Sequence, residues 1–437
     1  MSEAATDALN NKTAEKKDKT GITGILKKLG PGLITGASDD DPSGIATYSQ
    51  VGAHFGYGML WSILFSYPLM TAIQEISARI GRVTGRGIAG NLRKYYPNWI
   101  SHVIVGLMVI ANVINIGADI SAMGSALNLL IGGPVLLYAV LFSLLSVVLQ
   151  IYVPYTKYVR YLKWLTVSLF SYVITVFIVK VPWATTLKNT FLPSFSFNPV
   201  YLTSLIAVLG TTISPYLFFW QASQEVEDIR TTSEEDPLKK APQQAPEQIK
   251  RIRIDTYLGM AFSNIVAFFI MLATASTLYT HHITDINTSA QAAEALRPFA
   301  GKFSFLLFSA GIIGTGLLAI PVLAGSAAYA VGEAFKWKIG LEQKPRNAKN
   351  FYGVLAVATM LGLALDFTPI NPIKALFWSA VVNGVIAVPV MIIMMIMSSS
   401  AKVMGNFTIS VGLKLVGWIS TIAMLLASIG LFLTLGK

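Results

Sequence analysis

The sequence contains no cysteine and only four histidines in 437 residues. Without cysteine the chain can form no disulfide, no thiolate zinc site and no iron–sulfur cluster, and it has no thiol nucleophile. Four histidines do not favour a metal cage built from several imidazoles. These absences exclude the commonest structural metal centres and all thiol catalysis.

Charged residues are also scarce, at 13% of the chain, against roughly 25% in soluble domains. Hydrophobic residues make up 54%, and the mean hydropathy is +0.59. The sequence has no Walker motif, no nucleophile elbow and no His-Glu-x-x-His, so ATP hydrolysis and proteolysis have no support. The composition therefore predicts one polytopic membrane unit that is not an enzyme and needs no cofactor.

Apolar segments of membrane-spanning length recur after a polar start. Residues 1–25 carry several lysines and no apolar run, so we expect a disordered cytoplasmic tail rather than a signal peptide. We expect residues 26–437 to form a single all-α transmembrane domain of about eleven helices. The expected spans are 29–50, 55–80, 100–130, 133–153, 161–181, 199–224, 254–279, 302–333, 350–367, 371–398 and 412–435.

Basic residues are distributed unevenly between the two sides of this predicted topology. With the N-terminus inside, 27 of the 33 Lys and Arg residues fall in cytoplasmic segments. This positive-inside bias predicts a multi-pass cell-membrane protein with its N-terminus in the cytoplasm. The positive-inside bias explains why a membrane protein carries an excess of basic residues, here a net charge of +11. The net charge therefore gives no support to nucleic-acid binding. We interpret 225–253, which contains Pro237, Pro242 and Pro246, as a mobile cytoplasmic linker between two halves.

The first predicted span contains three consecutive aspartates, Asp39 to Asp41, followed by Pro42-Ser43-Gly44. Proline removes a backbone donor and glycine relaxes the chain, so we expect the helix to unwind near 41–44. Unwound backbone at membrane depth is tolerated where it lines a cavity, and buried acids there usually mark an ion route. The alternative is that these acids end a helix in water.

The sixth span has a matching interruption between Gly210 and Pro215, with hydroxyl side chains at Thr211, Thr212 and Ser214. Alone it could be an ordinary proline kink. Paired interruptions in corresponding positions of two halves are typical of inverted-repeat transporters, whose free carbonyls bind cations at the breaks. The two halves would be helices 1–5 and 6–10, with an eleventh helix added.

The chain resembles the Nramp (natural resistance-associated macrophage protein) family of divalent-metal transporters over most of its length after residue 25. The similarity lies in Leu29-Gly30-Pro31, Asp41-Pro42, Gly56-Tyr57-Gly58, Gln74, Ser77–Gly81, Thr84–Arg86, Ala118-Asp119 and Asp255. It implies a leucine-transporter-type (LeuT) fold and proton-coupled import of manganese or iron.

The resemblance also implies a metal site. Asp41 matches the family's metal-binding aspartate, and Thr211 takes the place of an alanine whose carbonyl binds metal. Gly44 replaces the family's asparagine, and Ser214 replaces its methionine. We therefore predict a site made of Asp41, Gly44, Thr211 and Ser214.

Further residues are candidates for proton transfer or for supporting the site. Asp40 precedes the core aspartate, and Asp119 lies in the third span. Tyr216 and Gln221 stand where the family has histidines, and two family glutamates fall at Asn112 and Ala122. These losses leave coupling to protons an open question.

The replacements at Gly44 and Ser214 favour a hard metal ion as the transported substrate. Thioethers favour softer metals, whereas carboxylates, carbonyls and water suit Mg²⁺ and Mn²⁺. The sequence therefore predicts a secondary transporter of divalent cations such as Mg²⁺ and Mn²⁺, most like the Nramp-related magnesium transporters and compatible with a monomer. Alternatives are a proton-coupled Mn²⁺/Fe²⁺ importer, a LeuT-fold symporter of amino acids or organic cations, and a passive channel.

Overall fold

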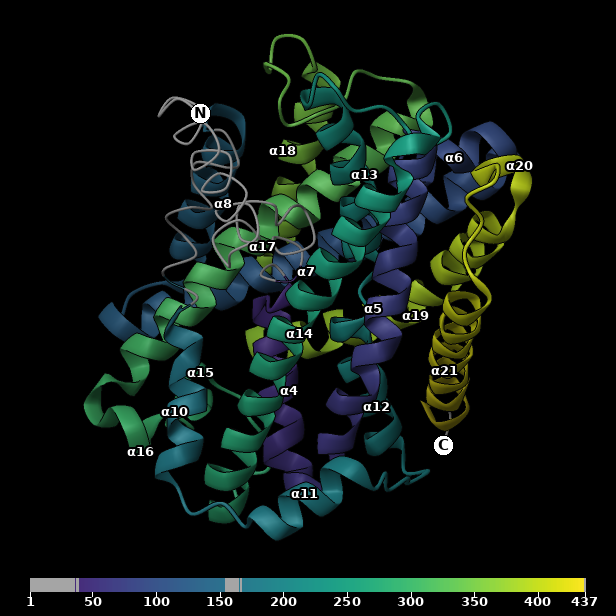
Figure 1. The fold of residues 1–437 in the computed structure, drawn as a ribbon. Helices are drawn as coiled ribbons and strands as arrows, with labels where there is room; N and C mark the ends of the chain where they lie inside the picture. The colour runs from purple at the N-terminus through teal and green to yellow at the C-terminus, as the bar shows by residue number, and fades with distance from the viewer. Residues whose placement is uncertain (1–35, 37–38, 154–164, 166, 436–437) are drawn as a thin grey trace, which may run out of the picture.

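The computed structural model describes residues 36, 39–153, 165 and 167–435, and its regular secondary structure there is entirely helical. The principal helices are α4 (Pro42–Phe55), α5 (Leu60–Thr84), α6 (Ile88–Tyr95), α7 (Asn98–Ile131), α8 (Val135–Tyr152), α10 (Phe170–Ile178), α11 (Trp183–Phe191), α12 (Pro199–Thr212), α13 (Pro215–Thr231), α14 (Ala245–Thr277), α15 (Ser289–Glu294), α16 (Arg297–Ala300), α17 (Ser304–Phe335), α18 (Lys349–Ala364), α19 (Pro372–Ser399), α20 (Ala401–Met404) and α21 (Val411–Leu435). The short helix η6 (Leu365–Phe367) follows α18. Figure 1 shows their arrangement.

Eight helical segments within the described residues are long and apolar enough to cross a membrane. They correspond to eight of the eleven expected spans. Of the other three, α5 is long but carries Glu75, Arg79 and Arg82. The first and fifth expected spans lie partly outside the described residues, which include only their C-terminal parts, α4 and α10. The expected tail at 1–25 lies wholly outside them.

Every second connection between successive spans lies at the same end of the bundle. At one end, Leu238 donates a backbone hydrogen bond to Arg82, and Lys239 Nζ donates one to the Val403 carbonyl at 3.0 Å. The segments after α5, α13 and α19 therefore lie together, as Figure 1 shows around α6 and α20. At the opposite end Asn371 Nδ2 donates to the Asn287 carbonyl at 2.9 Å, which joins the segments before α19 and α15.

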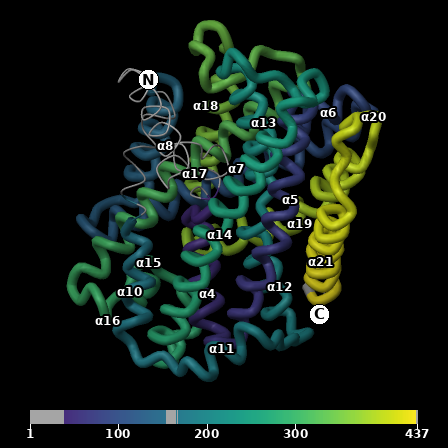
Figure 2. The backbone as a smooth tube through the Cα atoms, in the orientation of Figure 1, coloured from purple at the N-terminus to yellow at the C-terminus, as the bar shows by residue number. Residues whose placement is uncertain are grey.

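The broken helices lie inside the bundle, and the least buried helices lie at its edge. Most residues of α4 and α12 are buried. The two helices contact each other and α19, while α4 also contacts α14 and α12 also contacts α5. By contrast, α8 and α21 present exposed leucines, including Leu141, Leu144, Leu426 and Leu433, as expected of helices that face lipid. Figure 2 shows α21 along one side and α4 in the middle.

The segment 225–253 is structured differently from the linker predicted by its prolines. Residues 225–231 complete α13 and residues 245–253 begin α14, so only a short connection with one 3-10 turn at Pro242–Gln244 lies between them. The connection joins the sixth and seventh helices, and thus lies within the second five-helix group. Prolines at the first turn of a helix start it rather than prevent it, which is what Pro246 does in α14.

Candidate metal-binding site at two helix breaks

The break in the first helix is at Asp40 and Asp41. Asp41 has extended backbone angles (φ −71°, ψ 170°) and caps the N-terminus of α4, which begins at Pro42. Its carboxylate accepts hydrogen bonds from Gly44 N at 2.8 Å and Ser43 Oγ at 2.6 Å. We expected unwinding through 41–44, but 42–44 are already helical, because proline is well suited to the first helical position and aspartate to the cap.

The break in the sixth helix is at Ile213 and Ser214, as its Gly210–Pro215 interruption predicted. Ile213 ends α12 with φ −120° and ψ 62°, and Ser214 is the extended residue before α13, which again begins at a proline. Ser214 Oγ donates to the carbonyls of Gly210 at 2.8 Å and Thr211 at 2.9 Å. The hydroxyl thus covers carbonyls that the helix end leaves unpaired.

The two breaks face each other. A Cβ added to Gly44 would lie 3.0 Å from Thr211 Oγ1, so the absence of a side chain lets α4 and α12 approach here. Gly44 also contacts Asp41, and Thr211 contacts Ser214, through the hydrogen bonds above. The structure therefore brings all four predicted residues into one continuous group. All are buried, so the group is closed to solvent.

Asn115 is a member of this group that the sequence reasoning missed. It lies on α7 and donates from Nδ2 to Asp41 Oδ2 at 2.8 Å. Asp119 follows four residues later, on the same face of the same helix. That spacing is the signal that could have identified Asn115, since a polar residue one turn from a buried acid extends the polar face.

Asp40 contacts α14 rather than α7. Ser263 Oγ donates to Asp39 Oδ2 at 2.6 Å and lies 3.1 Å from Asp40 Oδ1. Ser263 was also missed, because nothing in the sequence of α14 marks one serine among its small residues. The aspartates on either side of the break thus have different neighbours.

Asp119, Tyr216 and Gln221 are fully buried, on α7 and α13. Neither carboxylate oxygen of Asp119 has a hydrogen-bond partner within the described part of the chain. Asp119 and Tyr216 both lie within electrostatic range of the Asp41 carboxylate. Gln221 lies on α13, nearly two turns beyond the break.

The donor atoms at the breaks are all oxygens, and one carboxylate dominates them. Across the described residues no three Asp, Glu or His side chains converge in a way that could hold a metal ion. A cation here would bind Asp41 and the Thr211 carbonyl at the C-terminal end of α12, where the helix dipole is negative. Such a site has few protein ligands, so a bound cation would keep some of its water.

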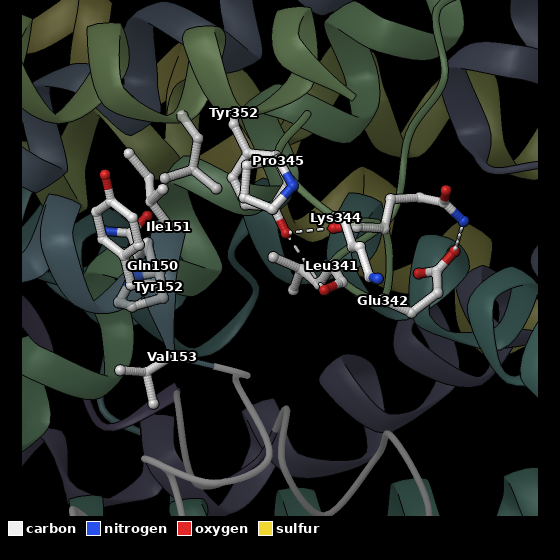
Figure 3. Close-up of a pocket in the computed structure, with 12 residues that line it drawn as sticks. Gln150, Ile151, Tyr152, Val153, Leu341, Glu342, Lys344, Pro345 and Tyr352 are labelled. Carbon is white, nitrogen blue, oxygen red and sulfur yellow. Dashed lines mark hydrogen bonds between the residues drawn. The ribbon is translucent and has the colours of Figure 1, made fainter. Parts of the chain in front are cut away.

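Figure 3 shows a cavity elsewhere, between the end of α8 and the α17–α18 connection. It measures about 190 Å³ and is lined by residues such as Gln150, Glu342 and Tyr352. None of the predicted site residues lines it. We assign this cavity no function.

Comparison with known proteins shows the family to which the chain belongs. The family model for natural resistance-associated macrophage protein-like sequences (Nramp) matches residues 32–434. The divalent metal cation transporter MntH of Bacillus subtilis is 24% identical over 99% of this chain and 96% of its own length. MntH of Mesorhizobium japonicum is 28% identical over 66% of this chain, a match that spans 63% of that relative.

Solved structures agree on the fold. The Eremococcus coleocola manganese transporter superposes with a TM-score of 0.70 at 18% identity, covering 94% of this chain and 86% of that one. Mhp1, a nucleobase-cation-symport-1 family transporter, gives 0.62 at 15% identity, covering 93% and 91%. The expected LeuT-type architecture, with helices 1–5 and 6–10 as inverted repeats, is confirmed. The chain is a multi-pass membrane protein and a member of the Nramp family.

Proposed function

We propose that this protein is a secondary transporter that carries divalent metal cations through the membrane, with Mn²⁺ as a cargo. The family membership, the relatives named divalent metal cation transporters and the structural neighbour titled a manganese transporter support this proposal. They favour Mn²⁺ over the Mg²⁺ emphasised by the sequence reasoning. The cargo would bind between the two breaks and become accessible from each side in turn as the half-helices move.

The position of Asp41 is the observation that carries the proposal. Its carboxylate is buried at a helix break, three residues from Gly44, which packs against Thr211 of α12. It has only neutral hydrogen-bond donors, from Ser43, Gly44 and Asn115. A carboxylate in a membrane interior is costly unless a cation or a proton neutralises it. A divalent cargo would supply that charge and take over contacts that the three donors now make.

Uptake of Mn²⁺ into proteoliposomes tests the proposal, with Asp41→Asn as the decisive variant. Asparagine caps a helix as well as aspartate does, so the start of α4 should survive while the charge is lost. We expect uptake to fall at least a hundredfold with unchanged size-exclusion behaviour. Normal uptake by Asp41→Asn, or stabilisation of the wild type by amino acids and not by Mn²⁺, would refute the assignment.

Transport of Mg²⁺ is a second candidate, which the donor set favours. Gly44 adds no ligand and Ser214 adds only a hydroxyl, so the site lacks the soft thioether implied by the family resemblance. Mg²⁺ is typically held by one or two carboxylates and several waters. Competition of Mg²⁺ with Mn²⁺ at comparable concentrations would support this candidate.

We further propose that protons, if they are co-transported, pass through Asp119. It is the buried acid within electrostatic range of Asp41 that has no hydrogen-bond partner among the described residues. Tyr216 and Asp40 lie at the same breaks, and Gln221 lies further along α13. A dye for internal pH in the uptake assay measures whether metal entry and proton entry are coupled.

A further inference from the structure

The first turns of α14 present basic side chains at the surface of the bundle, and apolar side chains follow them. Lys250 and Arg253 are exposed, and Tyr257 and Leu258 on the next turn are exposed by 36% and 48%. Lys250, Arg253 and Tyr257 lie three or four residues apart, so they share one face of the helix. This face changes from charged to apolar along the helix axis, as it would between lipid headgroups and hydrocarbon.

Two grooves border this face, and Arg253 lines both of them. The first groove measures about 670 Å³ and lies along α14, where Lys250 and Ile254 also line it. The second groove, the α5–α14–α21 groove, measures about 380 Å³ and has Tyr257 and Leu413 among its lining residues. Cavities of roughly 300–1,000 Å³ are typical of ligand sites. Arg253 therefore connects two spaces that are each large enough for part of a ligand.

Basic charge exceeds acidic charge along the two grooves. Glu75 is the one acid among the residues that line them, and Arg79 pairs with it at 2.5 Å. Arg253 Nε lies 3.5 Å from the same carboxylate oxygen, and its side chain remains 58% exposed. Lys250 forms no ion pair with the described residues, and Glu247, the exposed acid one turn before it, lines neither groove. One carboxylate thus faces two arginines, and a lysine adds to the surplus of positive charge.

We propose that this surface binds an anionic phospholipid. Its phosphate would contact Lys250 and Arg253, and an acyl chain would lie in the α5–α14–α21 groove. None of the residues at the two helix breaks lines either groove. The inference therefore goes beyond the proposed function and does not depend on the identity of the cargo.

The position and the shape of the surface favour a lipid over a soluble anion. Helix α14 begins shortly after Lys239, at the end of the bundle where basic connections gather. The charge bias predicts that this end faces the cytoplasm, where anionic lipids attract basic residues at the membrane surface. The exposed side chains of α14 after Arg253 are large and apolar: Ile254, Tyr257, Leu258, Phe262 and Ile265. A soluble anion would use the basic residues alone, whereas a phospholipid would cover both parts of the surface.

Native mass spectrometry of the purified full-length protein tests the proposal. The probes are phosphatidylglycerol, phosphatidylethanolamine and phosphatidylcholine with the same acyl chains. We expect phosphatidylglycerol to bind about tenfold more tightly than either zwitterionic lipid, because it alone carries net negative charge. The double variant Lys250→Gln with Arg253→Gln should lose this preference. It should still fold, because both side chains are exposed and Glu75 keeps Arg79 as its partner.

Two exposed basic residues elsewhere supply the matched control. Arg346→Gln with Lys349→Gln, at the start of α18, removes the same charge and should keep the preference for phosphatidylglycerol. If this control loses the preference as well, binding depends on the net charge of the protein and the proposal is wrong. Equal affinities of the wild type for the three lipids would overturn it, and so would an unchanged preference in the variant of Lys250 and Arg253.

Gly412→Phe tests the groove without changing any charge. Gly412 lines the α5–α14–α21 groove, and an added Cβ meets nothing within 4 Å, so the phenyl ring would enter open space. We expect phosphatidylglycerol to bind about tenfold more weakly, because its acyl chain loses the apolar surface that it would cover. Gly353→Phe, at an equally open position on α18, should leave the affinity unchanged. Equal affinities in the two variants would place the lipid outside the groove and overturn the proposal.

Glycerol phosphate separates a lipid site from a site for soluble anions, because it carries a phosphate without acyl chains. At a concentration equal to that of phosphatidylglycerol, it should leave lipid binding unchanged. Displacement of the lipid under this condition would show that the surface recognises the phosphate alone, and the assignment to a phospholipid would be wrong.

Discussion

At the scale of single residues, Asp41 combines a structural and a chemical role. Its carboxylate caps α4 through Gly44 N and is also the proposed charged ligand of the cargo. The cap is worth about 1 kcal/mol, which asparagine would retain. The side chains that donate hydrogen bonds to it, Ser43 and Asn115, are neutral and supply no charge. Either aspartate or asparagine can supply the cap, whereas the charge requires aspartate.

Selectivity should depend on Gly44, Thr211 and Ser214 together. The triple variant Gly44→Asn, Thr211→Ala and Ser214→Met introduces an amide and a thioether, and it removes the Thr211 hydroxyl that lies 3.0 Å from a Gly44 Cβ. We expect the affinity for Mn²⁺ relative to Mg²⁺ to rise about tenfold, which corresponds to about 1.4 kcal/mol. Competition between the two ions in the proteoliposome uptake assay measures this ratio.

Thr211→Ala alone is the matched control for that variant, and it should leave the ratio near that of the wild type. An unchanged ratio in a folded and active triple variant would show that these side chains do not determine selectivity. Size exclusion distinguishes this result from a loss of folding.

At the scale of helices, the sequence predicted the two breaks well and the contacts around them less well. Pro42 and Pro215 locate the breaks within three residues, because proline begins a helix in a predictable way. The spacing from Asp119 could have marked Asn115 as part of a polar helix face. Its contact with Asp41, and that of Ser263 with Asp39, could not be predicted, because they depend on how α7 and α14 pack against the first helix. Propensity and hydropathy describe one helix at a time, whereas a binding site is assembled from several.

The packing of α12 on α19 should not tolerate a side chain at Gly210. An added Cβ would lie 2.0 Å from the Ala380 carbonyl and 2.5 Å from Gly384 N, and both are backbone atoms that cannot turn aside. Gly210→Ala should therefore lower stability by about 2 kcal/mol or more, because overpacking forces the backbone to shift. Thermal unfolding of the detergent-purified variant measures the loss.

Gly353→Ala is the control for this prediction. Gly353 lies in α18 and an added Cβ meets nothing within 4 Å. Alanine favours a helix by up to about 1 kcal/mol over glycine, so this variant should be equally or more stable. Similar unfolding temperatures for the two variants would contradict the proposed α12–α19 contact.

A charge cluster centred on the buried Arg82 and Glu225 fixes the end of α13 and should control its movement. Arg82 on α5 is fully buried and pairs with Asp228 at 3.2 Å and with Glu235. Arg251 on α14 pairs with Glu225 at 2.5 Å. Removing one partner of a buried pair typically costs about 3–5 kcal/mol. Arg82→Gln should therefore favour states in which this end of α13 separates from α5.

The lack of native cysteine makes this separation measurable. A cysteine placed at Ser223, which is 4% exposed, should react with a thiol reagent at least tenfold faster in the Arg82→Gln background. Arg346→Gln, at an exposed arginine, should leave the rate unchanged. Equal rates in all three backgrounds would show that the cluster stabilises the fold without controlling the position of α13.

At the scale of the whole molecule, the charge bias and the structure agree on which connections share a side. The basic segments after the second, sixth and tenth helices are joined by hydrogen bonds from Leu238 and Lys239. The less basic segments are joined at the other end, where Gln50 Nε2 donates to the Thr284 carbonyl at 3.2 Å. A miscounted span would have placed basic connections at both ends.

We predict that the end of the bundle with α6 and α20 faces the cytoplasm. Lysine and arginine are retained on the cytoplasmic side during insertion, so a cysteine at Gln243 should be protected from an impermeant maleimide in intact cells. A cysteine at His281, exposed at the opposite end, should react. Permeabilised cells supply the control, because both positions should react there. Reaction at Gln243 and protection at His281 in intact cells would invert the topology, and the direction in which the two breaks open would invert with it.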